Sequence, residues 1–113
     1  MFSIKNRIWI ETKEKGNVLL GYGRVQLLQA IDEQGSLSKG AKVLKMSYKK
    51  AWDLVNSMNQ AGAEPLVILQ TGGKKGGGAV LTAYGQKLVA TYKELEQKNH
   101  QFLKAQEKLI NSI

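Results

Sequence analysis

The side chains with the most evident chemistry lie between Ser47 and residue 60. Ala51, Val55 and Met58 recur there at intervals of four and three residues, so a helix over this range has one apolar face. The opposite face is polar, and its members are Lys49, Asp53, Asn56 and Gln60. These residue types can form hydrogen bonds with the edges of base pairs, because lysine donates to guanine, asparagine pairs with adenine and aspartate accepts from cytosine.

Ser47 is a suitable N-cap for this helix, and the N-terminal end of a recognition helix is the end that contacts base edges. The residues of this helix that we expect to contact double-stranded DNA are Ser47, Tyr48, Lys49, Lys50, Asp53 and Asn56. An alternative stays open for Lys49 and Asp53, since residues four apart on a helix can pair with each other on a solvated face. Trp52 lies at the border of the two faces, and we expect it to be buried rather than to contact nucleic acid.

A second amphipathic helix is predicted just before this one, with Ser36 as its cap. Its inward face consists of Leu37, Ala41 and Leu44. Only Lys45 and Met46 separate the two helices, which suits a helix-turn-helix, although a plain helical hairpin remains an alternative. Hydroxyl groups and backbone N–H groups at helix starts favour anions. The residues expected to contact phosphates here are Ser36, Ser38 and Lys39.

A glycine-rich loop that carries Lys74 and Lys75 follows the two helices. Apolar segments at 66–70 and 79–82 flank it, so we predict a β-hairpin, the wing of a winged helix-turn-helix. The loop lacks the G-K-[ST] ending of a nucleotide-binding P-loop and does not lead into a helix. We therefore expect Lys74 and Lys75 to contact the phosphates or the minor groove of DNA.

Three further elements are predicted around this centre. Residues 4–11 and 18–20 are expected to form an N-terminal β-hairpin. A helix is expected at 23–34, ended by Gly35, and a long final helix at 83–111, capped by Thr82. The fold class is mostly α with small β: residues 1–20 as the hairpin, 21–82 as the winged helix-turn-helix core and 83–113 as a dimerisation helix. Within the core, the recognition helix covers about 47–60 and the wing about 66–82.

The final helix has an apolar heptad pattern, in which Leu88, Leu95, Phe102 and Leu109 recur every seven residues. Such a pattern is typical of a coiled-coil seam, and hence of a homodimer, with Asn99 as a polar residue that sets the register. The alternative is a helix that folds back onto its own domain. The residues expected at the dimer interface are Leu88, Tyr92, Leu95, Asn99, Phe102 and Leu109.

Charge and composition agree with a nucleic-acid partner. The net charge is +8, of which +5 falls between Gly35 and Gly78. With 113 residues, the chain can bury one core, and without cysteine it has neither disulfides nor thiolate zinc sites. We expect no membrane segment, cofactor, metal or small-molecule site, and a cytoplasmic protein. The single histidine, His100, has no evident catalytic partner, so we do not expect an enzyme.

From about residue 21 to residue 88, the chain resembles the N-terminal DNA-binding domain of the ModE family of molybdate-responsive regulators. More distantly, it resembles the LysR-type winged helix. The motifs that carry the resemblance are the helix start S-Y-K-x-A-W, at Ser47 to Trp52, and the wing T-G-G-x-x-G-G-G-A, at Thr71 to Ala79. The resemblance implies a dimer joined through long helices, with the helix-turn-helix at 37–59 in the major groove and the wing beside it.

The family's full-length regulator carries C-terminal molybdate-binding domains, whereas this chain ends at Ile113. We therefore expect a DNA-binding module without its own molybdate sensor. The leading hypothesis is a dimeric, sequence-specific transcription regulator that binds an inverted repeat in double-stranded DNA. The alternative is a protein-interaction adaptor that uses the winged helix to bind an acidic partner and the final helix to form a coiled coil.

Overall fold

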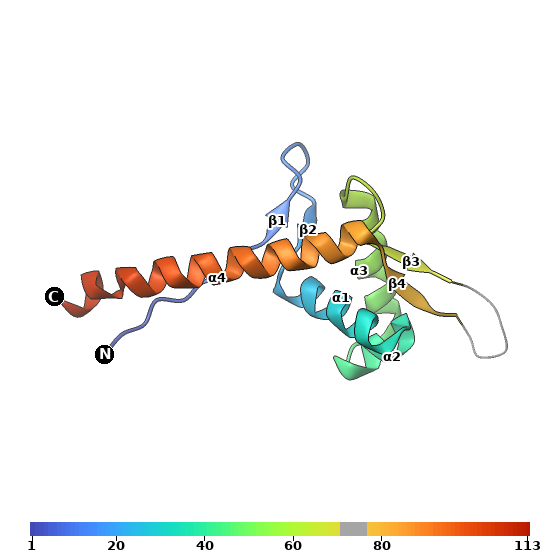
Figure 1. Cartoon of the computed structure of the whole chain (residues 1–113), viewed down its shortest axis with the longest axis horizontal. Coiled ribbons are helices and arrows are strands. Elements are labelled where there is room, and N and C mark those ends of the chain that lie inside the picture. The colour runs from blue at the N-terminus through green and yellow to red at the C-terminus, as the bar shows by residue number, and fades with distance from the viewer. Residues whose placement is uncertain (71–76) are drawn as a thin grey trace.

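The computed structural model describes residues 1–70 and 77–113. Within these residues, helices predominate, and two small antiparallel hairpins accompany them (Figure 1). The elements are β1 (Ile10–Glu11), β2 (Val18–Leu20), α1 (Tyr22–Gln34), α2 (Leu37–Val43), α3 (Tyr48–Ala61), β3 (Val67–Leu69), β4 (Ala79–Leu81) and α4 (Ala83–Asn111). The prediction of a mostly α fold with small β is confirmed.

The helices begin where the capping chemistry predicts. The side chains of Ser36, Ser47 and Thr82 each accept a hydrogen bond from the backbone N–H three residues ahead and so cap α2, α3 and α4. Gly35 ends α1 in a left-handed conformation, with φ of 75°, which glycine adopts without strain. Local interactions thus set four of the helix ends, three through side chains and one through the backbone of Gly35.

The core lies where α1, α2 and α3 meet β2, β3, β4 and the first turns of α4. Its largest fully buried side chains are Tyr92, Leu20, Leu27, Leu28, Ile31, Met58, Leu66, Val55 and Val67. Helices α1 and α2 approach closely at Gly40, where an added Cβ would lie 3.1 Å from the backbone nitrogen of Ile31. A glycine at this position therefore allows α2 to pack directly on α1.

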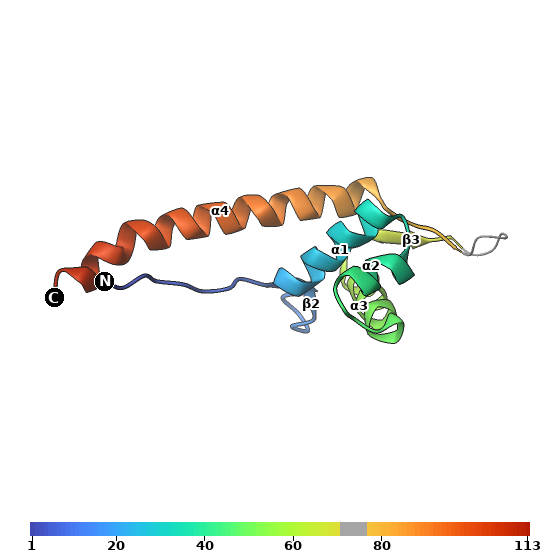
Figure 2. The same ribbon diagram turned by 90° about the horizontal axis from the view of Figure 1, so that it is seen from below.

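One of the two hairpins pairs as predicted, and the other is shorter than predicted. The wing forms as expected, with β3 and β4 paired from Val67–Leu81 to Leu69–Ala79. The N-terminal hairpin is shorter than predicted, because β1 starts at Ile10 rather than near Ile4. Residues 1–9 instead run as an extended segment beside the C-terminal half of α4, in both views (Figures 1 and 2).

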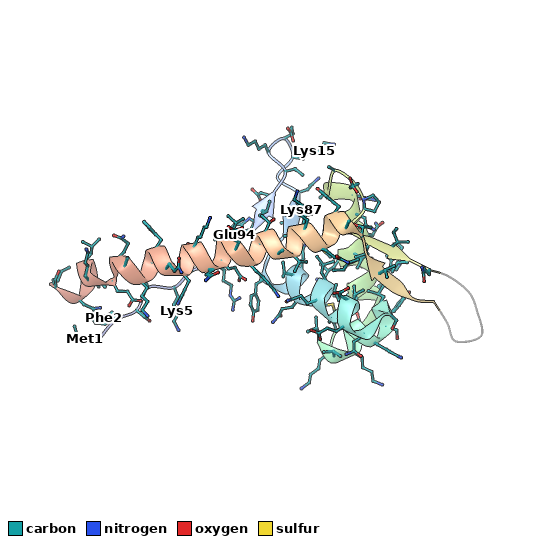
Figure 3. The ribbon with its side chains drawn as sticks, in the orientation of Figure 1. Met1, Phe2, Lys5, Lys15, Lys87 and Glu94 are labelled. Carbon is teal, nitrogen blue, oxygen red and sulfur yellow. The ribbon has the colours of Figure 1, made fainter. Side chains whose placement is uncertain are left out.

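Hydrogen bonds hold this N-terminal segment (residues 1–9) along α4. The backbone N–H of Phe2 donates to Asn111 at 2.9 Å, and that of Ile4 donates to the Glu107 carboxylate at 3.0 Å. Figure 3 accordingly shows Met1 and Phe2 beside the last turns of α4. Because α4 already fixes these backbone groups, the segment does not extend the β1–β2 pairing.

Tyr92 corrects one sequence-based prediction. We expected it at a dimer interface, but its side chain is 1% exposed and belongs to the core of its own chain. Its hydroxyl donates to the carbonyl oxygen of Ile8 at 2.8 Å. Burial, together with the negative charge of Glu96, raises the pKa of Tyr92, although Arg7 opposes the shift. The face of α4 that carries Gly85, Val89 and Tyr92 therefore packs against this chain and is not available to a second one.

The whole chain is elongated, with extents of 63 × 31 × 22 Å. Helices α1 to α3 gather on one side of α4, near its N-terminal end, and the wing strands point away from the end where both termini lie (Figure 2). Among residues 1–70 and 77–113, no helix is both long and apolar enough to cross a bilayer.

Candidate nucleic-acid interface

Helix α3 separates its two faces as its sequence predicts. Ala51, Val55 and Met58 are buried, at 1% exposure or less. The polar face of α3, defined by Lys49, Asp53, Asn56 and Gln60, is exposed at every one of these positions. The turn of the N-terminal hairpin lies beside part of this face, next to Asp53, Asn56 and Gln60, but leaves each of these residues exposed.

Lys49 and Asp53 pair with each other, as their spacing of four residues allows. The Lys49 Nζ atom lies 3.0 Å from an Asp53 carboxylate oxygen, and the two side chains are 85% and 51% exposed. A solvated pair at this spacing contributes only about 0.3–0.5 kcal/mol. Phosphates or base edges can therefore replace either partner at little cost.

Trp52 contradicts the expectation that it is buried. Its side chain is 43% exposed, and that of Tyr48, one helical turn earlier, is 57% exposed. Together with Lys49 and Asp53, these two aromatic residues line a shallow hollow of about 290 Å³, the aromatic hollow. The border of the polar face is therefore apolar and accessible.

The residues predicted to contact phosphates lie at the start of α2. Ser38 and Lys39 are exposed and Ser36 is half-buried. The hydroxyl oxygens of Ser36 and Ser47 already accept the capping bonds from the Lys39 and Lys50 amides, at 3.1 and 3.0 Å. Each hydroxyl keeps its own proton for donation, so capping and phosphate binding are compatible.

Of the remaining residues predicted to contact DNA, Tyr48 and Lys50 are exposed in the first turn of α3. Lys74 and Lys75 of the wing lie outside the described residues. The base of the wing lies within the described residues.

Asn59, which sequence analysis did not single out, joins α3 to the base of the wing. Its amide oxygen accepts from the backbone N–H groups of Leu66 and Val67 at 2.8 and 3.1 Å, and its amide nitrogen donates to the Val67 carbonyl at 2.9 Å. One side chain thereby fixes the start of β3 relative to the helix. The only signal in the sequence is an asparagine near the end of a helix that closely precedes a strand.

A second set of contacts fixes the other wing strand. The amide of Ala79 donates to the Gly35 carbonyl at 2.9 Å, and the Thr82 hydroxyl donates to the Pro65 carbonyl at 2.7 Å. At Gly85, an added Cβ would collide with the carbonyl oxygen of Leu66, so α4 starts directly against the base of β3. The wing is thus anchored to α1, α3 and α4.

Arg24 connects α3 with the N-terminal hairpin. Its guanidinium donates to the Val18 carbonyl and to the Ser57 hydroxyl, both at 3.1 Å. Burial lowers the pKa of Arg24, but a guanidinium remains charged in proteins. The hairpin turn and the C-terminal half of α3 enclose a polar hollow of about 450 Å³, which Arg24, Asp53 and Asn56 help to line. Figure 3 shows Lys15 at the tip of this hairpin.

The six residues predicted for the dimer interface do not share one environment. Leu95, Phe102 and Leu109, the apolar stripe of α4, are 42%, 61% and 63% exposed. Leu88 packs partly against the core, and Tyr92 is buried in it. Asn99 is half-buried and exchanges side-chain hydrogen bonds with Asn6 of its own N-terminal segment.

The described residues show no group of three or more histidine, aspartate, glutamate or cysteine side chains that could hold a metal ion.

Comparison with known proteins supports a relation to ModE-family proteins. The chain is 42% identical over 90 residues to the molybdenum transport protein ModE of Azotobacter vinelandii, covering 80% of this chain and 33% of that protein. It is 54% identical over 74 residues to the DNA-binding transcriptional dual regulator ModE of Escherichia coli strain K12, covering 66% and 28%. It is 45% identical over 98 residues to the molybdenum-pterin-binding protein MopB of Rhodobacter capsulatus, covering 87% and 36%.

No family model matches the chain. The chain spans about a third of the length of the curated relatives named above. These similarities relate it to ModE and Mop proteins, which include transcription regulators and molybdenum-related proteins.

Proposed function

We propose that this chain is a DNA-binding module of a transcription regulator and that α3 is its recognition helix. The observation that carries the proposal is the exposed polar face of α3. This face lies opposite the buried residues Ala51, Val55 and Met58. Helix α3 itself is the next element after α2 in the sequence. Similarity to the DNA-binding regulator ModE of Escherichia coli supports the same function.

In the proposed complex, α3 enters the major groove while α2 crosses the phosphate backbone, as in other helix-turn-helix proteins. Lys49, Lys50, Asp53 and Asn56 contact base edges, and Ser36, Ser38 and Lys39 contact phosphates. Lys74 and Lys75 contact the adjacent backbone from the wing. The proposal includes no catalysis and no cofactor, and it places the protein in the cytoplasm, where its DNA lies.

The proposal also includes a homodimer. The apolar stripe of α4 recurs every seven residues and leaves large side chains 42–63% exposed. A second copy of the same stripe would bury them by coiled-coil packing. Two copies of α3 would then contact the two halves of an inverted repeat.

Selection of bound DNA from a random pool, combined with light scattering, tests the proposal directly. We expect enrichment of a symmetric site and two chains per site. An adaptor that binds acidic proteins would enrich no sequence.

Variants of the polar face test which residues confer base preference. Lys49→Ala or Asn56→Ala should relax preference at particular positions of the selected site, because each removes donors to one base edge. Binding is measured by gel shift on the selected site and on single-base variants of it. Lys104→Ala, an exposed lysine of distal α4, is the control and should leave the preference unchanged. Equal loss on all sequences for Lys49→Ala and Asn56→Ala would contradict base contact by α3.

A further inference from the structure

The aromatic hollow is not explained by hydrogen bonding to bases or phosphates. Tyr48 and Trp52 are neighbours on the helix surface at i and i+4, and they remain 57% and 43% exposed. Both lie within the first five residues of α3, at the end that a recognition helix inserts into the groove. Exposed aromatic groups that adjoin one another indicate a surface that is covered when a partner binds.

We propose that the aromatic hollow receives the C5-methyl group of thymine in the major groove, so that this border of α3 selects thymine at defined positions. The proposal rests on the proposed function, because it requires α3 to lie in the groove. Thymine is the only one of the four DNA bases that displays an apolar group there. In this arrangement, Lys49, Asp53 and Asn56 form hydrogen bonds with polar base edges. Tyr48 and Trp52 contact the methyl groups.

Charge around the hollow favours DNA over an apolar protein surface. Lys49 lines the hollow, and Lys50 is exposed on the following position of the helix. Exposed Lys39 and Lys42 of the preceding helix add positive charge. A polyanion that carries apolar methyl groups in its groove matches both properties of this surface.

The hollow also lies next to the groups that are proposed to contact neighbouring bases. Its polar side is the Lys49–Asp53 ion pair, with Nζ and Oδ2 at 3.0 Å. A thymine methyl against Trp52 therefore places the adjoining base edge within reach of Lys49 or Asp53. Methyl contact and hydrogen bonding would act on adjacent positions of one half-site.

The experiment removes single methyl groups from the DNA rather than whole bases. In the selected site, each thymine is replaced in turn by deoxyuridine, which keeps every hydrogen-bonding group. We expect about a fourfold loss of affinity at one or two positions per half-site, the effect of exposing one buried methyl group. Trp52→Ala should abolish this difference between thymine and deoxyuridine, and Trp52→Phe should retain part of it.

Trp9→Phe is the matched control, because Trp9 is 63% exposed and lies outside α3. It should keep the full sensitivity to deoxyuridine. It also leaves Trp52 as the only tryptophan, so the fluorescence of Trp52 should change on binding the thymine site and change less on binding its deoxyuridine analogue. Thermal unfolding of each variant confirms that the fold is intact.

Two results would overturn the inference while the proposed function stands. One is a selected site that tolerates deoxyuridine at every position, and the other is full methyl sensitivity in a folded Trp52→Ala variant. Failure to select any sequence would instead overturn the proposed function and the inference together.

Discussion

At Asn59, a single amide side chain joins α3 to the start of β3 through three hydrogen bonds. The backbone groups that it satisfies belong to Leu66 and Val67, which are buried. A buried backbone N–H without a partner costs free energy, so these bonds matter for stability as well as for the relative position of α3 and β3.

Asn59→Ala should lower the free energy of unfolding by about 1–3 kcal/mol, because it leaves these buried backbone groups unpaired. Urea unfolding followed by circular dichroism measures the change. Gln60→Ala, at the next and exposed position, is the control and should change stability by less than about 0.5 kcal/mol. If Asn59→Ala were as stable as Gln60→Ala, the bonds to Leu66 and Val67 would not fix the wing.

At the candidate site, the sequence predicts the positions of some side chains but not of others. The Lys49–Asp53 pair was an open alternative because it depends only on helical spacing, and the structure confirms it. The exposure of Trp52 was not predicted. Trp52 stands at the border between two faces, and its burial depends on whether another segment packs against that border.

At the scale of elements, the helices were predictable because their determinants are local. Ser36, Ser47 and Thr82 each cap a helix by bonding three residues ahead, and Gly35 ends α1 by its own backbone conformation. The course of the N-terminal segment was not predictable in this way. It depends on bonds such as that between Ile8 and Tyr92, which are 84 residues apart in the sequence.

Tyr92→Phe should loosen the N-terminal segment, because it removes the donor to the Ile8 carbonyl. We expect a loss of stability of about 1 kcal/mol. We also expect faster tryptic cleavage after Lys5 and Arg7, which lie in the released segment. Mass spectrometry of timed digests identifies these cuts. Tyr48→Phe, which alters an exposed tyrosine of α3, should leave both measurements unchanged.

The stability difference between wild type and Tyr92→Phe should also depend on pH. The pKa of Tyr92 is raised in the folded chain, so the unfolded chain ionises first as the pH rises through the ordinary tyrosine pKa of 10.0. The stabilisation from neutral Tyr92 is therefore complete below about pH 9 and is lost at higher pH. The stability difference between wild type and Tyr92→Phe should shrink above about pH 10. A difference that stays constant would contradict the raised pKa.

At the scale of the whole molecule, the shape of the chain is compatible with the proposed dimeric DNA-binding module. Helices α1 to α3 and the β3–β4 hairpin lie at one end of an elongated chain, and both termini lie at the other (Figure 1). Much of α4 extends beyond the core and is accompanied only by the N-terminal segment among the described residues. A helix of this length adds little to one small core, which is why the proposed function includes association through its distal half.

The surface left on that distal half is the apolar stripe of α4. The N-terminal segment bonds to Asn99, Glu107 and Asn111 and leaves Leu95, Phe102 and Leu109 exposed. Glu107 and Asn111 lie away from the stripe, whereas Asn99 borders it, four residues after Leu95 and three before Phe102. One chain can therefore keep its own N-terminal segment in place while its stripe packs against a second chain.

Phe102→Glu should convert the proposed dimer into a monomer, because a charge at the centre of the seam cannot be buried without a partner. Light scattering should show half the mass at micromolar concentration. Affinity for the full inverted repeat should fall at least tenfold, whereas affinity for a half-site should stay the same, since the second α3 is no longer tethered. Gln101→Glu adds the same charge at the adjacent exposed position, outside the stripe, and should preserve both mass and affinity. A Phe102→Glu variant that remained dimeric would place the interface elsewhere, and one that lost half-site binding as well would show that Phe102 supports the fold rather than the seam.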